Sequence, residues 1–212
     1  MKISVLCSNP EHPIVDKLRA WCAEQPHDIE LLHSKSQLSG GDILFLVSCS
    51  ELISTSERDK YQHTLVLHAS DLPRGRGWSP YIWELLEGAE TITVSLLEAA
   101  EPVDSGRIWA KESFHVGKGW LWDEINDALF EAELNLMSFA IQNKENIKPE
   151  VQDESEGVSY YPKRSPKDSE LDVGKSLEEQ FNLLRVCDPK RYPATFKLYG
   201  HTYKITVEKT DD

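Results

Sequence analysis

The chain has 212 residues, of which 40% are hydrophobic and 28% charged, a composition typical of one soluble globular domain with a small appendage. Its 23 Lys and Arg residues face 36 Asp and Glu residues, so the formal net charge is −13. This balance argues against tRNA, DNA or another nucleic acid as the main partner, because such affinity depends on a dense basic surface. We recognise neither a membrane-spanning apolar run nor a signal peptide, and therefore expect a cytoplasmic protein that does not bind membranes.

The first half of the chain alternates short apolar runs with amphipathic segments. Strands are predicted at 2–6, 28–32, 42–47 and 64–68, and helices at 13–23 and 54–61. Such alternation predicts an α/β fold with a Rossmann-like, mostly parallel sheet. The loop after the first strand, Cys7-Ser8-Asn9-Pro10, contains no glycine, so the fingerprint of NAD or FAD binding is missing where it would have to lie.

The second half is predicted to complete this domain and to add an extension. A helix is expected at 79–87, strands at 91–99 and 107–111, and a long helix at 121–142 with core candidates Ile125, Leu129, Leu136, Phe139 and Ala140. The polar stretch 144–169 is interpreted as a linker or an ordered meander, followed by a helix at 176–186 and strands at 194–199 and 201–207. We therefore divide the chain into a domain at 1–143 and an extension at 144–212. Its last two strands offer an edge through which a homodimer could form, a monomer being the alternative.

No metal site is expected from the cysteines or histidines. The four cysteines, at positions 7, 22, 49 and 187, show no CxxC spacing, and buried spectator thiols are the better interpretation for Cys7 and Cys49.

The densest group of chemically useful residues runs from His68 to Pro80, directly after a buried strand. Ligands of parallel α/β sheets bind beyond the carboxyl ends of the strands, so His68 stands where reactive groups are usually found. Arg74, Arg76 and Trp78 follow in a loop shaped by glycine and proline. The alternative is structural: the imidazole binds a backbone carbonyl and the arginines are solvated.

A second candidate is Asp104, which lies in the turn Val103-Asp104-Ser105-Gly106 between two predicted strands. An Asp that faces a His can hold one imidazole tautomer and stabilise the protonated ring. An Asp in such a turn also commonly caps the turn itself, and spacing alone leaves both interpretations open.

Taken together, these motifs resemble the folate-dependent formyltransferases. The resemblance rests on His68-Ala-Ser-Asp-Leu-Pro, Gly75-Arg-Gly and Val103-Asp-Ser-Gly-Arg-Ile, and on a second set that includes Tyr161-Pro-Lys-Arg and Tyr192-Pro-Ala-Thr-Phe. The second set is similar to the segment that follows the catalytic domain in methionyl-tRNA and sugar formyltransferases. The residues Gly75-Arg-Gly-Trp-Ser-Pro resemble the nucleotide-sugar N-formyltransferases of the pseudaminic acid type more than the tRNA enzymes.

The resemblance implies transfer of a formyl group from N10-formyltetrahydrofolate to the amine of a nucleotide-linked 4-amino-4,6-dideoxy sugar, with UDP as the expected nucleotide. His68 would act beside the formyl carbon and Asp104 would orient it. The folate would be bound by two loops, one holding Ser50, Glu51, Leu52 and Ile53 and the other holding Glu101, Val103 and Asp104. Arg74 and Arg76 are candidates for a substrate phosphate, and Trp78 for stacking on a sugar or base, with solvated arginines and a packed indole as the alternatives.

One position departs from the family pattern. The family has an Asn two residues before the catalytic His, whereas this chain has Val66, which cannot donate a hydrogen bond to an oxyanion. Thr64 and Ser70 are expected on the same strand face and are the candidate substitutes. Methionyl-tRNA or a carrier-bound amine as the acceptor, and a non-catalytic binding protein, remain the alternative functions.

Overall fold

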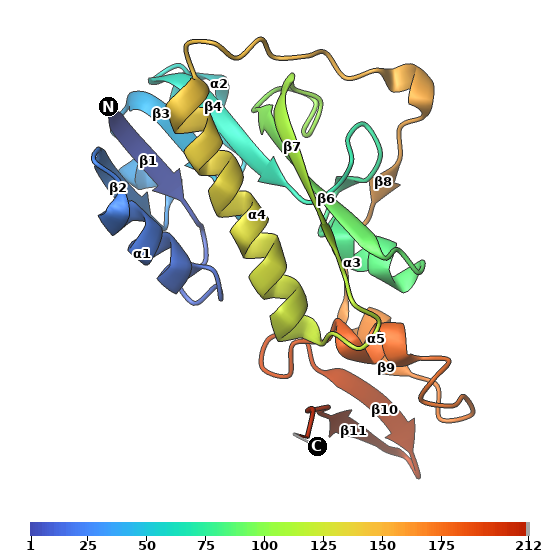
Figure 1. The fold of residues 1–212 in the computed structure, drawn as a ribbon. Coiled ribbons are helices and arrows are strands. Elements are labelled where there is room, and N and C mark those ends of the chain that lie inside the picture. The colour runs from blue at the N-terminus through green and yellow to red at the C-terminus, as the bar shows by residue number, and fades with distance from the viewer. Residues whose placement is uncertain (211–212) are drawn as a thin grey trace.

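Apolar runs of the sequence form a six-stranded central sheet, which the computed structural model describes within residues 1–210 (Figure 1). In spatial order its strands are β2 (Asp28–Leu32), β1 (Lys2–Leu6), β3 (Gly41–Leu46), β4 (Tyr61–His68), β6 (Thr91–Glu98) and β7 (Ile108–His115). The first four strands are parallel, while β6 and β7 are each antiparallel to their neighbours. The predicted mostly parallel α/β sheet is thereby confirmed.

The register of the parallel strands brings several loops to one edge of the sheet. Leu6 of β1 pairs with Leu46 of β3, and Leu46 pairs with Val66 of β4. Strand β4 continues two residues further, to His68. The loops after β1 and β3 and the end of β4 therefore lie side by side, as expected for the carboxyl edge of a parallel sheet.

Two helices cover one face of the sheet, α1 (Val15–Glu24) and α4 (Trp122–Asn143), and Figure 1 shows α4 crossing the sheet obliquely. Leu129, Leu136 and Ala140 of α4 are buried in the largest apolar cluster, and Ile125 is buried in a neighbouring one. The prediction that Phe139 belongs to the core is wrong, because this residue is exposed. It lies one residue before Ala140 and so falls outside the buried stripe of the helix.

The opposite face of the sheet is only partly covered. The short helices η1 (Lys35–Gln37) and α2 (Thr55–Arg58) pack there around an apolar cluster that contains Leu44 and Leu46. Cys49, Val66 and Ala99 border this cluster and are only partly buried. This side of the sheet therefore keeps an accessible apolar surface close to the carboxyl end of β4.

The polar stretch after α4 is an ordered meander that returns to the domain. It contains η2 (Glu154–Glu156), β8 (Tyr160–Tyr161) and η3 (Pro166–Ser169). Strand β8 pairs in parallel with β5 (Arg76–Gly77), which precedes α3 (Pro80–Leu86). The segment after residue 150 is consequently packed against the connection between β4 and α3, residues 69–79, which we call the 70s loop.

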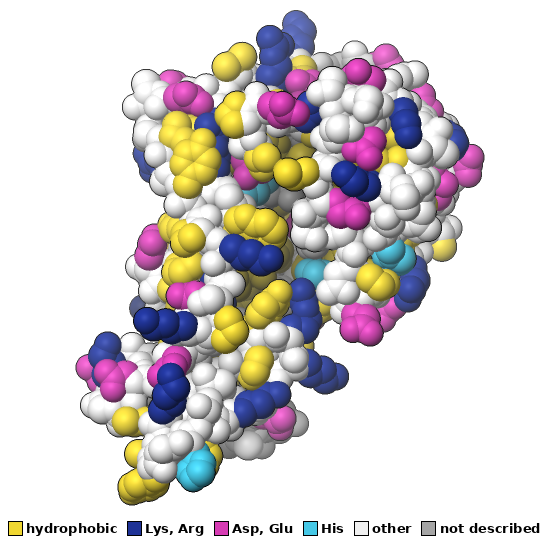
Figure 2. All heavy atoms as spheres, turned by 180° about the vertical axis from the view of Figure 1, so that it is seen from behind, with side chains coloured by type: hydrophobic (Ala, Val, Ile, Leu, Met, Phe, Trp, Pro, Cys, Tyr) yellow, Lys and Arg dark blue, Asp and Glu magenta, His cyan; other side chains and the backbone are white. Residues whose placement is uncertain are grey.

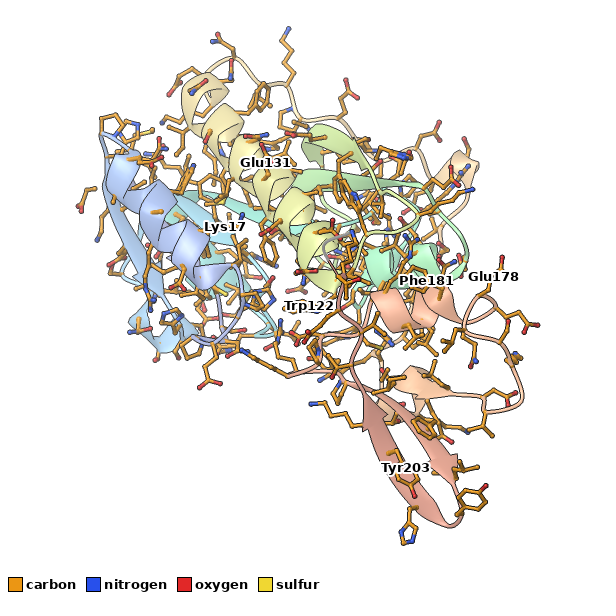
Figure 3. The ribbon with its side chains drawn as sticks, turned by 60° about the horizontal axis from the view of Figure 1, so that its bottom comes forward. Lys17, Trp122, Glu131, Glu178, Phe181 and Tyr203 are labelled. Atoms are coloured by element: carbon orange, nitrogen blue, oxygen red, sulfur yellow. The ribbon has the colours of Figure 1, made fainter. Side chains whose placement is uncertain are left out.

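The remainder forms a small unit with its own sheet and apolar cluster. Strand β9 (Glu170–Leu171) pairs with β10 (Ala194–Leu198), which forms a hairpin with β11 (His201–Ile205), and α5 (Phe181–Arg185) packs nearby. Figure 3 shows Tyr203 on this hairpin, well away from the central sheet. Within residues 1–210, no helix is long and apolar enough to cross a bilayer.

Candidate active site

His68 ends β4 with a buried side chain whose two ring nitrogens face different groups. Its Nε2 lies 2.8 Å from the main-chain oxygen of Gly75, and its Nδ1 lies 3.6 Å from Oδ1 of Asp104. A carbonyl oxygen only accepts hydrogen bonds, so Nε2 carries a proton and donates it to Gly75. Nδ1 is therefore the nitrogen that can accept a further proton, and it faces a carboxylate.

Asp104 is buried in a turn that is held from several sides. Its backbone is left-handed, with φ of 61°, and its Oδ2 accepts a hydrogen bond from the Gly77 amide at 2.9 Å. Two residues later, a Cβ on Gly106 would lie 1.8 Å from the main-chain oxygen of Glu98, so that position requires glycine. The carboxylate thus has a defined place beside His68.

The two hydroxyls considered as substitutes for the family's Asn make no hydrogen bond to His68 in the described part of the chain. Thr64 precedes His68 by four residues on the same strand, which corresponds to about 13 Å along the strand. Ser70 is fully buried, and a Cβ on Gly75 would lie 2.8 Å from its Cβ and 3.2 Å from its Oγ. Within residues 1–210, both hydroxyl oxygens are buried without a hydrogen-bond partner. Val66 lies between Thr64 and His68 on the same face and is only partly buried.

The two loops expected to bind folate flank the open apolar surface. Leu52 of the first loop is 76% exposed, and Val103 of the second loop is 54% exposed. Such exposure is unusual for large aliphatic side chains. An ion pair of 3.3 Å joins Arg58 of α2 to Glu101 of the second loop. It links the second loop to the helix that follows the first loop. The partly buried Val66 borders the apolar cluster that contains Ile53 of the first loop.

Other residues of the first loop are engaged within the protein. The amide of Ser50 donates to the hydroxyl of Ser8 at 2.9 Å, and the carboxylate of Glu51 accepts from the amide of Lys35. Ile53 is buried in the apolar cluster under η1 and α2. Ser50 and Leu52 are both exposed, and Leu52 is the large apolar side chain of this loop that faces outward. Figure 2 shows the face opposite α4, which is hollowed along a line between the N-terminal half and the rest, with hydrophobic side chains beside it.

The expectation that Arg76 projects from its loop towards a substrate phosphate is wrong. Its side chain is 3% exposed, because the pairing of β5 with β8 covers it, and it binds Gln152, Glu154 and Tyr160. Arg74 and Trp78 lie on the surface, and the ammonium of Lys163 sits 4.7 Å from the centre of the Trp78 ring.

The half-buried carboxyl of Glu84 lies close to Gly75 of the loop. Burial, followed by the nearby carboxylates of Glu87 and Asp71, raises the pKa of Glu84 to about 7. One of its oxygens would lie 3.1 Å from a Cβ on Gly75. Within the described part of the chain, no group of three or more His, Cys, Asp or Glu side chains is arranged to hold a metal ion.

Sequence reasoning missed Gln152 altogether. Its side chain binds the turn that holds Asp104, but it lies in a polar stretch that was interpreted as a linker or meander. No local pattern marks it, because its partners are more than 40 residues away.

A buried His–Asp pair at the carboxyl end of a central parallel strand, beside an open apolar surface, is a site of the type that α/β enzymes use for proton transfer. A family model described as formyl transferase matches residues 8–141. The chain belongs to the formyl transferase family.

Individual relatives differ in the acceptors that their names indicate. Methionyl-tRNA formyltransferase of Streptococcus pneumoniae is 29% identical over 170 residues, which cover 78% of this chain and 53% of that protein. The chain thus spans about half the length of the curated relatives it matches.

Solved structures share the fold over nearly the whole chain. Methionyl-tRNA formyltransferase from Clostridium thermocellum has a TM-score of 0.84 and 18% identity, covering 100% of this chain and 94% of that one. HypX from Aquifex aeolicus in complex with tetrahydrofolic acid has a TM-score of 0.84 and 20% identity, covering 98% and 37%. A 4-N formyltransferase from Francisella tularensis has a TM-score of 0.76 and 15% identity, covering 100% and 98%.

Proposed function

We propose that this protein transfers the formyl group of N10-formyltetrahydrofolate to the amine of a nucleotide-linked 4-amino-4,6-dideoxy sugar. The observation that carries the proposal is the buried pair of His68 and Asp104 at the end of β4, adjoining an open apolar surface. The family assignment supports formyl transfer as the reaction.

The donor site would be the space between the two loops after β3 and before Asp104. Leu52 and Val103 are exposed and Val66 is partly buried, and apolar side chains of this kind suit the faces of a pteridine ring. The complex of HypX with tetrahydrofolic acid, on a similar fold, supports the same ligand class. When bound, N10-formyltetrahydrofolate supplies an activated formyl carbon.

In this proposal His68 moves the proton that the acceptor amine must lose. Its Nε2 stays protonated by donating to Gly75, so Nδ1 takes up the amine proton and later returns it to the leaving nitrogen. The protonated ring would then lie 3.6 Å from the Asp104 carboxylate, which faces Nδ1. The Gly77 amide keeps that carboxylate in place.

One observation favours a nucleotide sugar over a nucleic acid as the acceptor. The net charge of −13 is unfavourable for binding a nucleic acid. Arg74 and Trp78 are the residues of the 70s loop that we propose for contact with the phosphate and the sugar or base. A UDP-linked sugar of the pseudaminic acid type is the specific acceptor we would test first.

Methionyl-tRNA is the second candidate acceptor, and the relative from Streptococcus pneumoniae favours it. The two acceptors require different protein surfaces. Binding of tRNA requires clustered Lys and Arg side chains, whereas a nucleotide sugar needs only a local basic group. Strong loss of acceptor binding between about 50 and 200 mM salt would indicate the tRNA.

The experiment is a formyl-transfer assay read by mass spectrometry, with N10-formyltetrahydrofolate as the donor. The acceptors are a panel of UDP- and dTDP-linked 4-amino sugars and, in parallel, methionyl-tRNA. A product 28 Da heavier, about the mass that replacement of an amine hydrogen by formyl adds, from one sugar supports the proposal. Product from methionyl-tRNA alone favours the second candidate, and a wholly negative panel leaves carrier-bound amines and a non-catalytic protein as the next hypotheses.

A further inference from the structure

The side chain of Gln152 occupies a buried position between two parts of the candidate active site. It is 7% exposed and comes from the meander after α4, outside the residues that the family model matches. Its Nε2 donates to the main-chain oxygens of Asp104 at 2.8 Å and Gly106 at 2.9 Å. Its Oε1 accepts from Nη2 of Arg76 at 2.7 Å.

These three hydrogen bonds leave the amide only one orientation. A flipped amide would place its oxygen against two carbonyl oxygens and its NH₂ group against a guanidinium, so every contact would be repulsive. Arg76 is itself held by Glu154 and Tyr160. Arg76 of β5 therefore fixes the side-chain amide of Gln152 through its oxygen. The two N–H groups of that amide bind the turn of Asp104.

The turn needs such support, because Asp104 has a backbone conformation that non-glycine residues seldom adopt. Gln152 binds its main chain, and the Gly77 amide binds its carboxylate. The separation of 3.6 Å between Asp104 Oδ1 and His68 Nδ1 is slightly beyond hydrogen-bond length. A displacement of the turn by a few tenths of an ångström would decide whether the two groups interact.

We propose that Gln152 is a positioning residue, which holds the carboxylate of Asp104 against His68 by binding both carbonyls of the turn. The inference deepens the proposed function and rests on it for the role of the His–Asp pair. Gln152 acts through Asp104 and its test therefore needs a measurement that reports on the carboxylate itself. The Gly77 amide provides one, since it donates to that carboxylate.

The principal variant is Gln152→Met in the full chain, because Met has nearly the same length and forms none of the three hydrogen bonds. We expect kcat to fall by about 10- to 100-fold, with the KM for N10-formyltetrahydrofolate changed less than about twofold. In ¹H–¹⁵N NMR spectra the Gly77 amide proton should move upfield and exchange faster than its neighbours, as it loses a charged acceptor.

Ser138→Ala is the matched control. The Ser138 hydroxyl accepts a hydrogen bond from the Trp21 indole at 2.8 Å, between α4 and α1 and away from the 70s loop. Its loss should lower thermal stability to a similar extent, with kcat and the Gly77 signal unchanged. Gln152→Asn, which keeps the amide but withdraws it by one carbon, should lie between wild type and Gln152→Met, and replaces the latter if that variant does not fold.

Unchanged kcat together with an unchanged Gly77 signal in the Gln152 variants would overturn the inference. So would a pattern like that of Ser138→Ala, in which stability falls without a selective change at Gly77. If the wild-type protein transfers no formyl group, the proposed function fails, while the selective change at the Gly77 amide still decides whether Gln152 positions Asp104.

Discussion

Gly75 and Gly77, two glycines of one loop, hold the two members of the His–Asp pair. The carbonyl of Gly75 accepts from Nε2 of His68 at 2.8 Å, and the amide of Gly77 donates to Oδ2 of Asp104 at 2.9 Å. Both glycines have positive φ, and a Cβ on Gly77 would lie 2.4 Å from the main-chain oxygen of Tyr161. The loop therefore sets the distance between imidazole and carboxylate through its backbone, which ties the site to the pairing of β5 with β8.

Replacing Asp104 by Asn should abolish most of the activity and little of the stability. Asn tolerates the left-handed backbone and can still accept from Gly77, but it cannot stabilise a protonated His68. We expect kcat to fall by about 100-fold or more. Steady-state formyl transfer and thermal unfolding measure the two effects. Asp127→Asn is the control, because Asp127 is exposed and pairs with Lys17 on α1. Equal activity of the two variants would contradict the role of Asp104.

Replacing Val66 by Asn should raise turnover. The side chain lies on the same face of β4 as His68, two residues before it, and is partly exposed at the apolar surface. An amide there would add a donor for the developing oxyanion, and we expect kcat to rise by about tenfold. Val66→Leu has about the shape of Asn without any hydrogen-bond donor, and it should show no gain. A kcat of Val66→Asn at or below that of wild type would show that position 66 lies away from the developing charge.

Gly106→Ala should destabilise the fold strongly. Its Cβ would lie 1.8 Å from the carbonyl oxygen of Glu98, a backbone atom that cannot rotate away. We expect the free energy of unfolding in urea to fall by about 3 kcal/mol or more. Gly119→Ala meets no atom within 4 Å and should change it by less than about 1 kcal/mol. Similar values for the two variants would contradict the close approach of the turn to β6.

Glu133→Gln should change how stability depends on pH. This carboxyl on α4 is 4% exposed, and burial raises its pKa from 4.5 to about 8. The folded state therefore keeps a proton that the unfolded state releases, so the stabilisation is complete below pH 4.5 and is lost as pH rises towards 8. The variant cannot ionise and escapes this loss.

Relative to wild type, Glu133→Gln should thus become more stable by on the order of 4 kcal/mol between pH 4.5 and 8, with no further gain above pH 8. Unfolding in urea at a series of pH values measures the difference, from which the contributions of all other titrating groups cancel. Parallel stability curves for the two proteins would show that Glu133 is charged in the folded state at neutral pH.

The periodicity of the sequence by itself determined the order and type of the longer elements, whereas the two-residue strands β5, β8 and β9 and the short helices η1, η2 and η3 were not predicted. Apolar runs and helical spacing are local properties, so β1, β3, β4 and the long α4 lie within a few residues of their predicted bounds. It also determined that His68 follows a buried strand, which places it at the carboxyl edge of the sheet. Phe139 was misplaced because an apolar residue at the border of a helix stripe is buried only if a neighbour covers it.

Only the tertiary structure decided which polar groups of the site meet. Arg76 is buried, Thr64 lies far along the strand from His68, and Gln152 binds the turn of Asp104. The burial of Arg76 and the contacts of Gln152 depend on the packing of the segment after residue 150 against the 70s loop. The distance between Thr64 and His68 depends on the rise of strand β4 between them. Contacts between segments so distant in the chain leave no local pattern, because any polar side chain of suitable length can form them.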